Sequence, residues 1–330
     1  MTTYKEAGVD IQAGDEAVKK IKSKVKSTFS NNVLLDIGGF GGAFKFPSEE
    51  YEEPILVSSV DGVGTKLKIA FMSAVHDTIG QCLVNHCTND ILVLGAKPLF
   101  FLDYFATDKL RTDVFESVVS GLSKACIENS CSLIGGETAE MPGFYQENEY
   151  DMSGTVVGVV DRKNLLSNRK VESGDVILGL PSTGLHTNGY SLARKVLLDK
   201  YKIDEFIPSL NCTISEALLA IHKSYLNILS PIINNPDLHA LSHITGGGII
   251  GNISRVIEKN QNITIDWDAW DRPEIFNLIQ KEGSVPEDDI RTSMNLGIGL
   301  VLIVSKEKVN IFEDYFKSQD EPYYLIGNIK

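Results

Sequence analysis

Hydrophobic positions in the first half of the chain predict strands and helices in mixed order. Short apolar runs predict strands at residues 55–60, 98–106, 132–134 and 154–160. Apolar residues three and four positions apart predict helices at 76–94 and 113–129, and a basic helical run precedes them at 19–26. The segments GGFGGAF and GGETAEM are rich in glycine and predict loops. Because strands and helices do not alternate regularly, an α+β fold is favoured over a doubly wound sheet.

The second half of the chain shows the same mixture. Strands are predicted at 176–180, 263–267, 297–304 and 323–329. Helices are predicted at 188–199, 215–233 and 307–317, with a further one after the TGGG segment. A polar, turn-forming stretch at 161–175 separates the halves. We therefore expect an N-terminal domain at 1–165, with a glycine-rich lid segment at 1–50, and a C-terminal domain at 170–330.

Composition and charge narrow the classes of function. The chain is 43% hydrophobic and 23% charged, as in ordinary globular proteins. Its longest apolar runs are too short to span a membrane, and its first ten residues lack the layout of a secretory signal. The net charge of −13 repels nucleic acid. We expect a cytoplasmic protein without a membrane or nucleic-acid partner.

Five cysteines are typical of reduced thiols in a cytosolic protein. The pairs Cys82/Cys87 and Cys126/Cys131 share a CxxxxC spacing that could indicate a metal site. Zinc sites usually have closer pairs, and residues five apart on a helix lie about 140° apart. Buried thiols are therefore the favoured interpretation.

The segment DGVGTK combines residues that suit a nucleotide phosphate. Asp61 ends a predicted strand, where a carboxylate can hold Mg²⁺, while Gly62 and Gly64 permit close approach of the backbone. Lys66 can pair with phosphate. The segment lacks the GxxxxGK[ST] frame of a P-loop, so taken alone it is also explained as a strand-terminal turn.

Two further acidic sites strengthen this hypothesis. Asn89 and Asp90 lie in an otherwise apolar predicted helix, where a carboxylate is costly unless it is paired or bound to metal. Glu137 and Glu140 lie in the GGETAEM segment. Three acidic sites at the edges of elements could converge on cations that bridge a triphosphate.

The second half offers a competing motif. Gly246, Gly248 and Gly251 spell GxGxxG, and Asp266 follows at about the distance seen in dinucleotide-binding proteins. The strand predicted before it is short and polar, and repeated βαβ units are missing around it. A dehydrogenase that binds NAD remains an alternative at this point.

Two histidines stand out by their position. His186 lies in GLHTNGYSL and His243 in SHITGGG, both in glycine-containing loops beside predicted helices. Such loops attract phosphate, so both histidines are candidates for a functional role. In contrast, His76, His222 and His239 are predicted to be surface or helix-cap residues.

Taken in order, the motifs of the chain resemble those of the AIR synthetase family. The matching segments cover nearly the whole chain: TYKEAGVDI, GGFGG, DGVGTK, HCTND, GAKPLFFLDYFAT, GGETAEMPG, HTNGYSL and HITGGG. DGVGTK and the ND pair are shared with a wider ATP-binding superfamily, whereas PLFFLDY, GGETAEMPG and HTNGYSL are more specific to this family.

The resemblance implies a fold and a reaction. It implies two α+β domains, of which the first has a mixed sheet that pairs with its copy in a homodimer to form a barrel. The second domain is expected to be an α+β sandwich with helices on one face of its sheet. The implied activity is ATP-dependent ring closure of formylglycinamidine ribonucleotide to aminoimidazole ribonucleotide, with release of ADP and phosphate, in purine biosynthesis.

The resemblance also implies roles for individual residues. The catalytic candidates are Lys22, Asp90, His186 and His243. Mg²⁺ would be held by Asp61, Asp90 and Glu137, and a requirement for K⁺ is left open. ATP would contact Gly38, Gly39, Gly41, Gly42, Asp61, Gly62, Gly64, Thr65, Lys66, Asn89, Gly136 and Thr138. The substrate would contact Ser59, Asn188, Thr245, Gly246, Gly247 and Gly248.

Rival interpretations remain within the same superfamily. Another small-molecule kinase or synthetase, such as thiamine-phosphate kinase, would not explain GGETAEMPG or HTNGYSL. Selenophosphate synthetases carry a reactive residue in the N-terminal glycine-rich loop, and here no cysteine precedes Cys82. A non-catalytic nucleotide-binding module is disfavoured because the acidic residues are present. Relatives usually continue beyond LIGNIK, so we expect a shortened last strand or tail.

Overall fold

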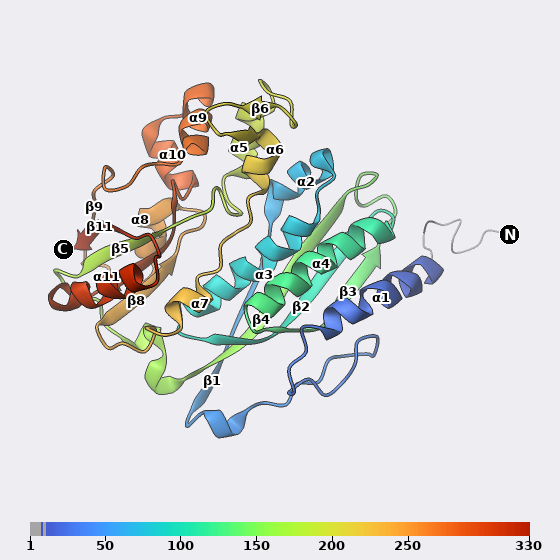
Figure 1. The fold of residues 1–330 in the computed structure, drawn as a ribbon, viewed down its shortest axis with the longest axis horizontal. Coiled ribbons are helices and arrows are strands. Elements are labelled where there is room, and N and C mark those ends of the chain that lie inside the picture. The colour runs from blue at the N-terminus through green and yellow to red at the C-terminus, as the bar shows by residue number, and fades with distance from the viewer. Residues whose placement is uncertain (1–7, 9–10) are drawn as a thin grey trace. The chain divides into compact units, whose positions relative to one another are not determined.

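The computed structural model describes Gly8 and residues 11–330, so the beginning of the predicted lid segment lies outside the described residues (Figure 1). The chain forms two compact units. The first comprises the chain up to Ile91 together with Lys97–Asp161, and the second comprises Leu92–Ala96 together with Arg162–Lys330. Each unit has its own sheet and its own core, and the two are described separately.

The first unit is built on a mixed four-stranded sheet in the order β1-β4-β2-β3. Its strands are β1 (Pro54–Gly62), β2 (Lys97–Thr107), β3 (Ser132–Glu140) and β4 (Tyr150–Asp161). Only β2 and β3 run parallel. The prediction of a loop at GGETAEM is wrong for most of that segment, because β3 stays paired with β2 as far as Glu140. Pairing along a neighbouring strand thus overrides the turn preference of two glycines.

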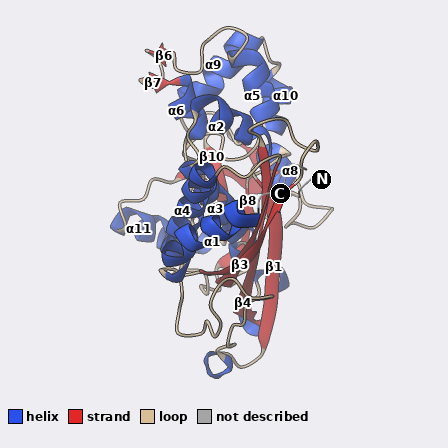
Figure 2. Ribbon diagram, turned by 90° about the vertical axis from the view of Figure 1, so that its right-hand side faces the viewer, coloured by secondary structure: helices blue, strands red, loops and turns tan. Residues whose placement is uncertain are grey.

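Helices cover one face of this sheet. Figures 1 and 2 show α3 (Asp77–Leu92) and α4 (Thr112–Glu128) over the strands, with α1 (Ile11–Lys26) beside α4 and β3. Glycines bring α3 and α4 into close contact, because a Cβ atom on Gly121 would overlap the carbonyl oxygen of Asp77. The short helix α2 (Leu67–Ser73) follows the turn at Gly64–Lys66.

The opposite face of this sheet is apolar and partly exposed. Val60 pairs with Thr155, which pairs with Leu102, so these side chains share one face. On β1, Val60 is 67% exposed and Leu56, four residues earlier on the same face, is 63% exposed. Exposed aliphatic residues on a sheet face are typical of a surface that binds another protein.

The second unit contains a five-stranded antiparallel sheet in the order β8-β10-β5-β11-β9. Its strands are β5 (Val176–Pro181), β8 (Leu238–His243), β9 (Ile263–Ile265), β10 (Ile298–Val304) and β11 (Tyr324–Ile329). A two-stranded hairpin, β6 (Phe206–Ile207) with β7 (Cys212–Thr213), lies outside this sheet.

Both faces of the second sheet are packed, so the prediction of helices on one face only is wrong. Leu300 and Leu302 of β10 belong to a core with α7 (Leu226–Leu229) and α11 (Val309–Ser318). The alternate residues Val301 and Ile303 belong to a second core with α8 (Gly248–Ile253). The run of apolar residues in β10 is continuous because a strand that is covered on both faces needs no polar side.

The long helix predicted at 215–233 is also wrong, because the chain forms two short helices there. They are α6 (Ile214–Leu219), which begins at a capping box on Thr213, and α7. The interval between them carries His222 and Tyr225 into the interior, where both are fully buried. Three more helices complete the unit: α5 (Tyr190–Leu197), α9 (Glu274–Gly283) and α10 (Glu287–Ser293). Among the described residues, no helix combines the length and the hydropathy needed to cross a membrane.

Candidate active site

In the first unit, two predicted aspartates lie beside a shared histidine. Asp61 is at the end of β1 and Asp90 is in the last turns of α3. The Nε2 atom of His86 lies 2.8 Å from Asp61 Oδ2 and 3.8 Å from Asp90 Oδ2. Ser59 Oγ donates a hydrogen bond of 2.8 Å to Asp90 Oδ2. The structure therefore brings together three of the predicted site residues, and it adds His86, which the sequence analysis missed. His86 lies four residues before Asp90 on a predicted helix, and this spacing was the signal that could have identified it.

The electrostatics of this group suit a cation. Burial acts to raise the pKa of Asp61, but hydrogen bonding and the charge of His86, with the Gly62 amide, outweigh it and hold the pKa below its usual value. The neighbouring Asp90 carboxylate opposes this by like-charge repulsion. Two carboxylates that converge on one side chain offer the oxygen ligands that Mg²⁺ prefers. The residues present thus fit a Mg²⁺ site.

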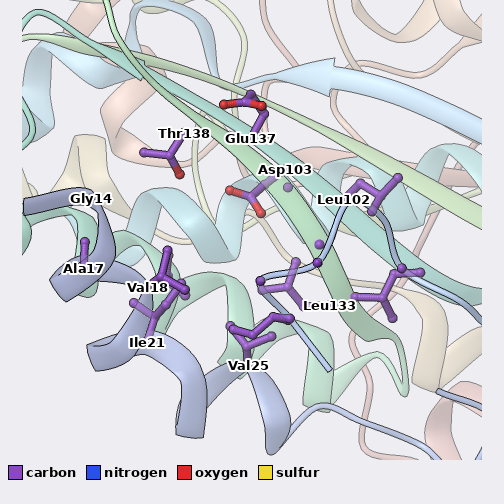
Figure 3. A pocket seen from close by; sticks show the side chains of 18 of the residues that line it. Gly14, Ala17, Val18, Ile21, Val25, Leu102, Asp103, Leu133, Glu137 and Thr138 are labelled. Atoms are coloured by element: carbon purple, nitrogen blue, oxygen red, sulfur yellow. The ribbon is translucent and has the colours of Figure 1, made fainter. Parts of the chain in front are cut away.

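A cavity of about 710 Å³ lies elsewhere in the same unit (Figure 3). One wall is an apolar stripe of α1 with Ala17, Val18 and Ile21. The remaining walls come from the glycine-rich segment 36–42 and from residues of β2 and β3. The volume and the mostly apolar lining with a few polar groups are those of a small-molecule site.

Five of the glycines predicted to contact ATP line this cavity. Gly38, Gly39, Gly41, Gly42 and Gly136 all line it. Gly38 has a positive φ of 99°, which side chains rarely adopt. A Cβ atom on Gly42 would lie 2.8 Å from the carbonyl oxygen of Ile134, so glycine is required for the segment to lie against β3. Thr138 of β3, a predicted contact of ATP, also lines the cavity.

The two candidate lysines occupy different environments. The Nζ atom of Lys22 lies 2.9 Å from Asp36, which lines the cavity, and Lys26 also pairs with Asp36. These ion pairs lower the pKa of Asp36 to about 2. By contrast, Lys66 is fully buried, and its Nζ atom lies 3.1 Å from Cys82 Sγ. The structure therefore brings Lys22, the catalytic candidate, near the cavity, whereas Lys66, predicted to contact ATP, is packed into the interior.

Glu137 is not brought to the aspartate pair. It lies on β3 at one edge of the sheet, whereas Asp61 lies on β1 at the other edge. Three strand spacings of about 4.8 Å separate the two edge strands, or roughly 14 Å. A single ion cannot be held across that distance, so Glu137 lines the cavity instead of completing the set with Asp61 and Asp90.

Asp103 is a cavity residue that the sequence reasoning missed. It pairs in register with Gly136, and a Cβ atom on that glycine would overlap the Asp103 carboxylate. Burial raises the pKa of Asp103 to about 7. Its signal in the sequence was a single acidic residue inside the apolar run PLFFLDYFA.

In the second unit, the two loops predicted to bind substrate lie together. A Cβ atom on Gly246 would lie 3.3 Å from Asn188 Oδ1, which shows how closely the HTNGYSL and TGGG loops approach. Asn252 holds the TGGG loop by donating hydrogen bonds to the carbonyl oxygens of Thr245, Gly246 and Gly248. Asn188, Thr245 and Gly246 are therefore placed side by side.

The dinucleotide interpretation of this loop is wrong. A Rossmann fingerprint follows the first strand of a parallel βαβ unit. Here β8 precedes the glycines and pairs antiparallel with β10 at the edge of an antiparallel sheet. Within this loop, Gly248 of the motif and its neighbour Gly247 serve backbone geometry, because they have positive φ values of 66° and 102°.

Three histidines of the second unit contact one another. His186 stacks on His222 with ring centroids 4.0 Å apart, and His222 Nε2 lies 3.0 Å from His243 Nε2. The predicted pair of functional histidines is thus joined by a third. The prediction of His222 as a surface residue is wrong, because it is fully buried. His186 has a positive φ of 60°, a strained conformation that is common at functional sites.

Solved structures share this fold, and one of them was determined in complex with ATP. A thiamine-monophosphate kinase from Stenotrophomonas maltophilia K279a aligns with a TM-score of 0.70 and 18% identity, covering 94% of this chain and 93% of that one. The hydrogenase maturation protein HypE in complex with ATP aligns with a TM-score of 0.64 and 19% identity, covering 95% of this chain and 83% of that one. At such low identities the likeness establishes the fold alone.

Sequence comparison is more specific. Residues 50–160 match the AIR synthase related protein, N-terminal domain, and residues 172–330 match its C-terminal domain. The phosphoribosylformylglycinamidine cyclo-ligase of Alkaliphilus oremlandii (strain OhILAs) is 47% identical over 99% of this chain and 96% of its own length. That of Thermodesulfovibrio yellowstonii is 47% identical over 98% of this chain and 95% of its own. The chain therefore belongs to the AIR synthase related family and, within it, to the phosphoribosylformylglycinamidine cyclo-ligases.

Proposed function

We infer that this chain closes the imidazole ring of a purine precursor with the use of ATP. The reaction converts formylglycinamidine ribonucleotide and ATP into aminoimidazole ribonucleotide, ADP and phosphate. The observation that carries the inference is the 47% identity to cyclo-ligases over nearly the full length of both chains. The fold alone does not decide the activity, because a kinase of the same fold shares only 18% identity.

ATP is proposed to occupy the 710 Å³ cavity of the first unit. The apolar stripe of α1 suits the purine base, and the glycine backbone at 38–42 suits the phosphates, because it offers amide groups without side chains. Lys22 is exposed enough to reach a phosphate when it leaves Asp36. Gly136 and Thr138 would contact the nucleotide from β3.

Mg²⁺ is proposed to bind Asp61 and Asp90. When bound, it neutralises charge on the phosphates during transfer. Ser59 orients the Asp90 carboxylate through its hydrogen bond, and His86 holds Asp61. Asn89 is fully buried next to Asp90 in α3 and stays a predicted contact of ATP. Glu137 would contact a different part of the nucleotide, consistent with its position on the far edge strand.

The substrate is proposed to bind the second unit through Asn188 and the loop Thr245–Gly248. In the reaction, the formyl oxygen of the substrate attacks the γ-phosphorus and ADP leaves. The amidine-derived nitrogen then attacks the activated carbon, and phosphate leaves with the former formyl oxygen. A proton is lost from the attacking nitrogen, and His243 or His186 accepts it. Positioning supplies much of the rate, because nucleophile and electrophile belong to one molecule.

A homodimer is proposed from the uncovered face of the first sheet. Leu56, Val60 and Tyr104 are exposed there, whereas the opposite face is covered by helices. A second copy of the same sheet would bury this surface and close a barrel. A cytoplasmic location is proposed as the compartment of the purine pathway.

The test is a stoichiometric assay with the purified chain. Synthetic formylglycinamidine ribonucleotide, ATP and Mg²⁺ are mixed, and ADP and aminoimidazole are quantified together. Equal amounts of both products are expected, and replacement of K⁺ by Na⁺ in parallel reports any need for K⁺. ADP release without aminoimidazole, or no release that depends on this substrate, would reject the assignment in favour of another kinase or synthetase of the same fold.

A further inference from the structure

A further cavity, of about 460 Å³, lies within the second unit. Segments that are far apart in the sequence form it: residues 93–94, 166–171 and 255–258, together with residues 239–241 of β8. All of them belong to the second unit. Among the described residues that line this cavity, none belongs to the proposed sites for ATP, Mg²⁺ or the substrate. The ring-closure reaction therefore gives the cavity no role.

Hydrogen bonds hold the walls of this cavity in place. Nη1 of Arg169 donates to the carbonyl oxygens of Asn235 and Leu238, at 2.6 Å each. The amide of Leu166 donates to the carbonyl oxygen of Leu94 at 3.1 Å. These bonds join segments that are distant in the sequence, so the cavity is formed by the fold itself, as is usual for small-molecule sites.

The lining of the cavity carries an excess of positive charge. Arg169, Lys170 and Arg255 line it, and Glu258 is the single acidic residue among the described lining residues. The chain as a whole has a net charge of −13, so most of its surface repels anions. A cleft of the opposite sign concentrates anions locally. The cavity is therefore suited to a negatively charged ligand.

Carboxylates do not neutralise these basic groups. In the part of the chain that the structure describes, Lys170 and Arg255 are exposed and form no ion pair. Arg169 is half-buried, and its hydrogen bonds go to backbone carbonyl oxygens, which carry no formal charge. Burial lowers the pKa of Arg169, but a guanidinium group stays charged in proteins. His239 also lines the cavity, but its Nδ1 atom pairs with Asp175 at 2.7 Å.

The rest of the lining suits an uncharged body attached to the anion. Its apolar side chains are those of Val93, Leu94, Leu166, Leu241, Val256 and Ile257. The volume lies in the range of small-molecule sites, and a free phosphate ion would leave most of it to water. A phosphomonoester of nucleotide size has both parts, because it joins a charged phosphate to a largely apolar base.

We propose that this cavity binds a phosphomonoester of nucleotide size. Its phosphate contacts Lys170 and Arg255, and its apolar body lies against the apolar lining. Arg169 shapes the wall and adds to the positive potential, because Nη1 is already engaged by the backbone. The proposal does not rest on the ring-closure reaction, since the residues proposed for that reaction do not line this cavity.

The test follows binding at the cavity itself by NMR of methyl-labelled protein. Ile257 lines this cavity, whereas Ile21 lines the cavity proposed for ATP, so their methyl signals report the two places separately. AMP, inorganic phosphate and adenosine are titrated in turn. AMP is expected to shift the Ile257 signal at roughly 10-fold lower concentration than phosphate or adenosine, because each of these lacks one part of the interaction.

Lys170→Gln combined with Arg255→Gln removes two charges at exposed positions, so the fold should be retained. The affinity for AMP measured at Ile257 is expected to fall by roughly 10-fold or more, because hydrogen bonds to charged groups contribute on this scale. Lys202→Gln combined with Lys281→Gln is the matched control. Both lysines are exposed in the same unit and do not line the cavity, and the net charge changes equally.

The proposal fails if AMP leaves the Ile257 signal unchanged. It also fails if the variant at Lys170 and Arg255 binds AMP as tightly as the unaltered protein, or if the control variant loses as much affinity, because these residues would then not hold the phosphate. Adenosine that binds as tightly as AMP would exclude recognition of the phosphate. Inorganic phosphate that binds as tightly as AMP would exclude the apolar body.

Discussion

His86 Nε2 lies 2.8 Å from Asp61 Oδ2, which ties the end of β1 to the middle of α3. The contact has two consequences. It holds the pKa of Asp61 below its usual value, so the carboxylate stays charged for cation binding. It also brings Asp61 near Asp90, because His86 and Asp90 are one helical turn apart on α3.

Asp90→Asn is expected to lower turnover by roughly 100-fold or more, because electrostatic groups at the site of charge transfer contribute on this scale. The amide still accepts the hydrogen bond from Ser59, so the fold should be retained. Turnover and Mg²⁺-dependent thermal stabilisation by ATP are measured together. Asp113→Asn, at an exposed position of α4, is the control. Normal turnover in the Asp90 variant would remove this residue from the metal site.

Asp103→Asn is expected to change how stability depends on pH. The folded pKa of about 7 lies above the value of 3.8 for an unperturbed aspartate, so the folded state binds the proton more tightly. Stability therefore falls as pH rises from about 4 to about 7, by at most about 1.4 kcal/mol per pH unit. The Asp103→Asn variant should not show this decline in stability. The free energy of unfolding is measured with urea between pH 4 and 7 for both proteins. An identical dependence of that free energy on pH in both proteins would contradict the prediction.

Gly121→Ala is expected to destabilise the first unit by about 1–3 kcal/mol, because the added methyl group meets the backbone of α3. Gly14→Ala is a matched control, since it is also a glycine inside a helix but has no atom within 4 Å of the added group. It should stabilise by up to about 1 kcal/mol through helix propensity. Thermal melting of both variants checks the contrast. If Gly121→Ala left the melting temperature unchanged or raised it, α3 and α4 would be less closely packed than in this structure.

Leu56→Asp combined with Val60→Asp is expected to convert a dimer into monomers. The two charges would be buried if a second sheet covered this face, and desolvation would oppose association. Ile127→Asp is the control, because Ile127 is 52% exposed on α4 and lies outside this face. Sedimentation or light scattering gives the oligomeric state. A monomer before substitution, or an unchanged dimer after it, would argue against this interface.

The sequence by itself determined most elements of the fold. The helix periodicity at 76–94 corresponds to α3, and the apolar runs at 98–106 and 297–304 correspond to β2 and β10. The aspartate after the first strand and the polar pair inside α3 were recognised because charge in an apolar segment is costly without a partner. Family motifs then identified the reaction more specifically than the fold could.

Tertiary structure alone decided which of these residues meet. Glu137 and Asp61 looked equivalent along the chain, yet β1 and β3 are opposite edges of the sheet, and strand order cannot be read from local pattern. His222 was predicted at the surface and Lys66 at a phosphate, yet both side chains are fully buried. Local periodicity reports which side of an element is apolar, because that depends on backbone geometry. It does not report which element covers that side, because packing partners are set by contacts between distant segments.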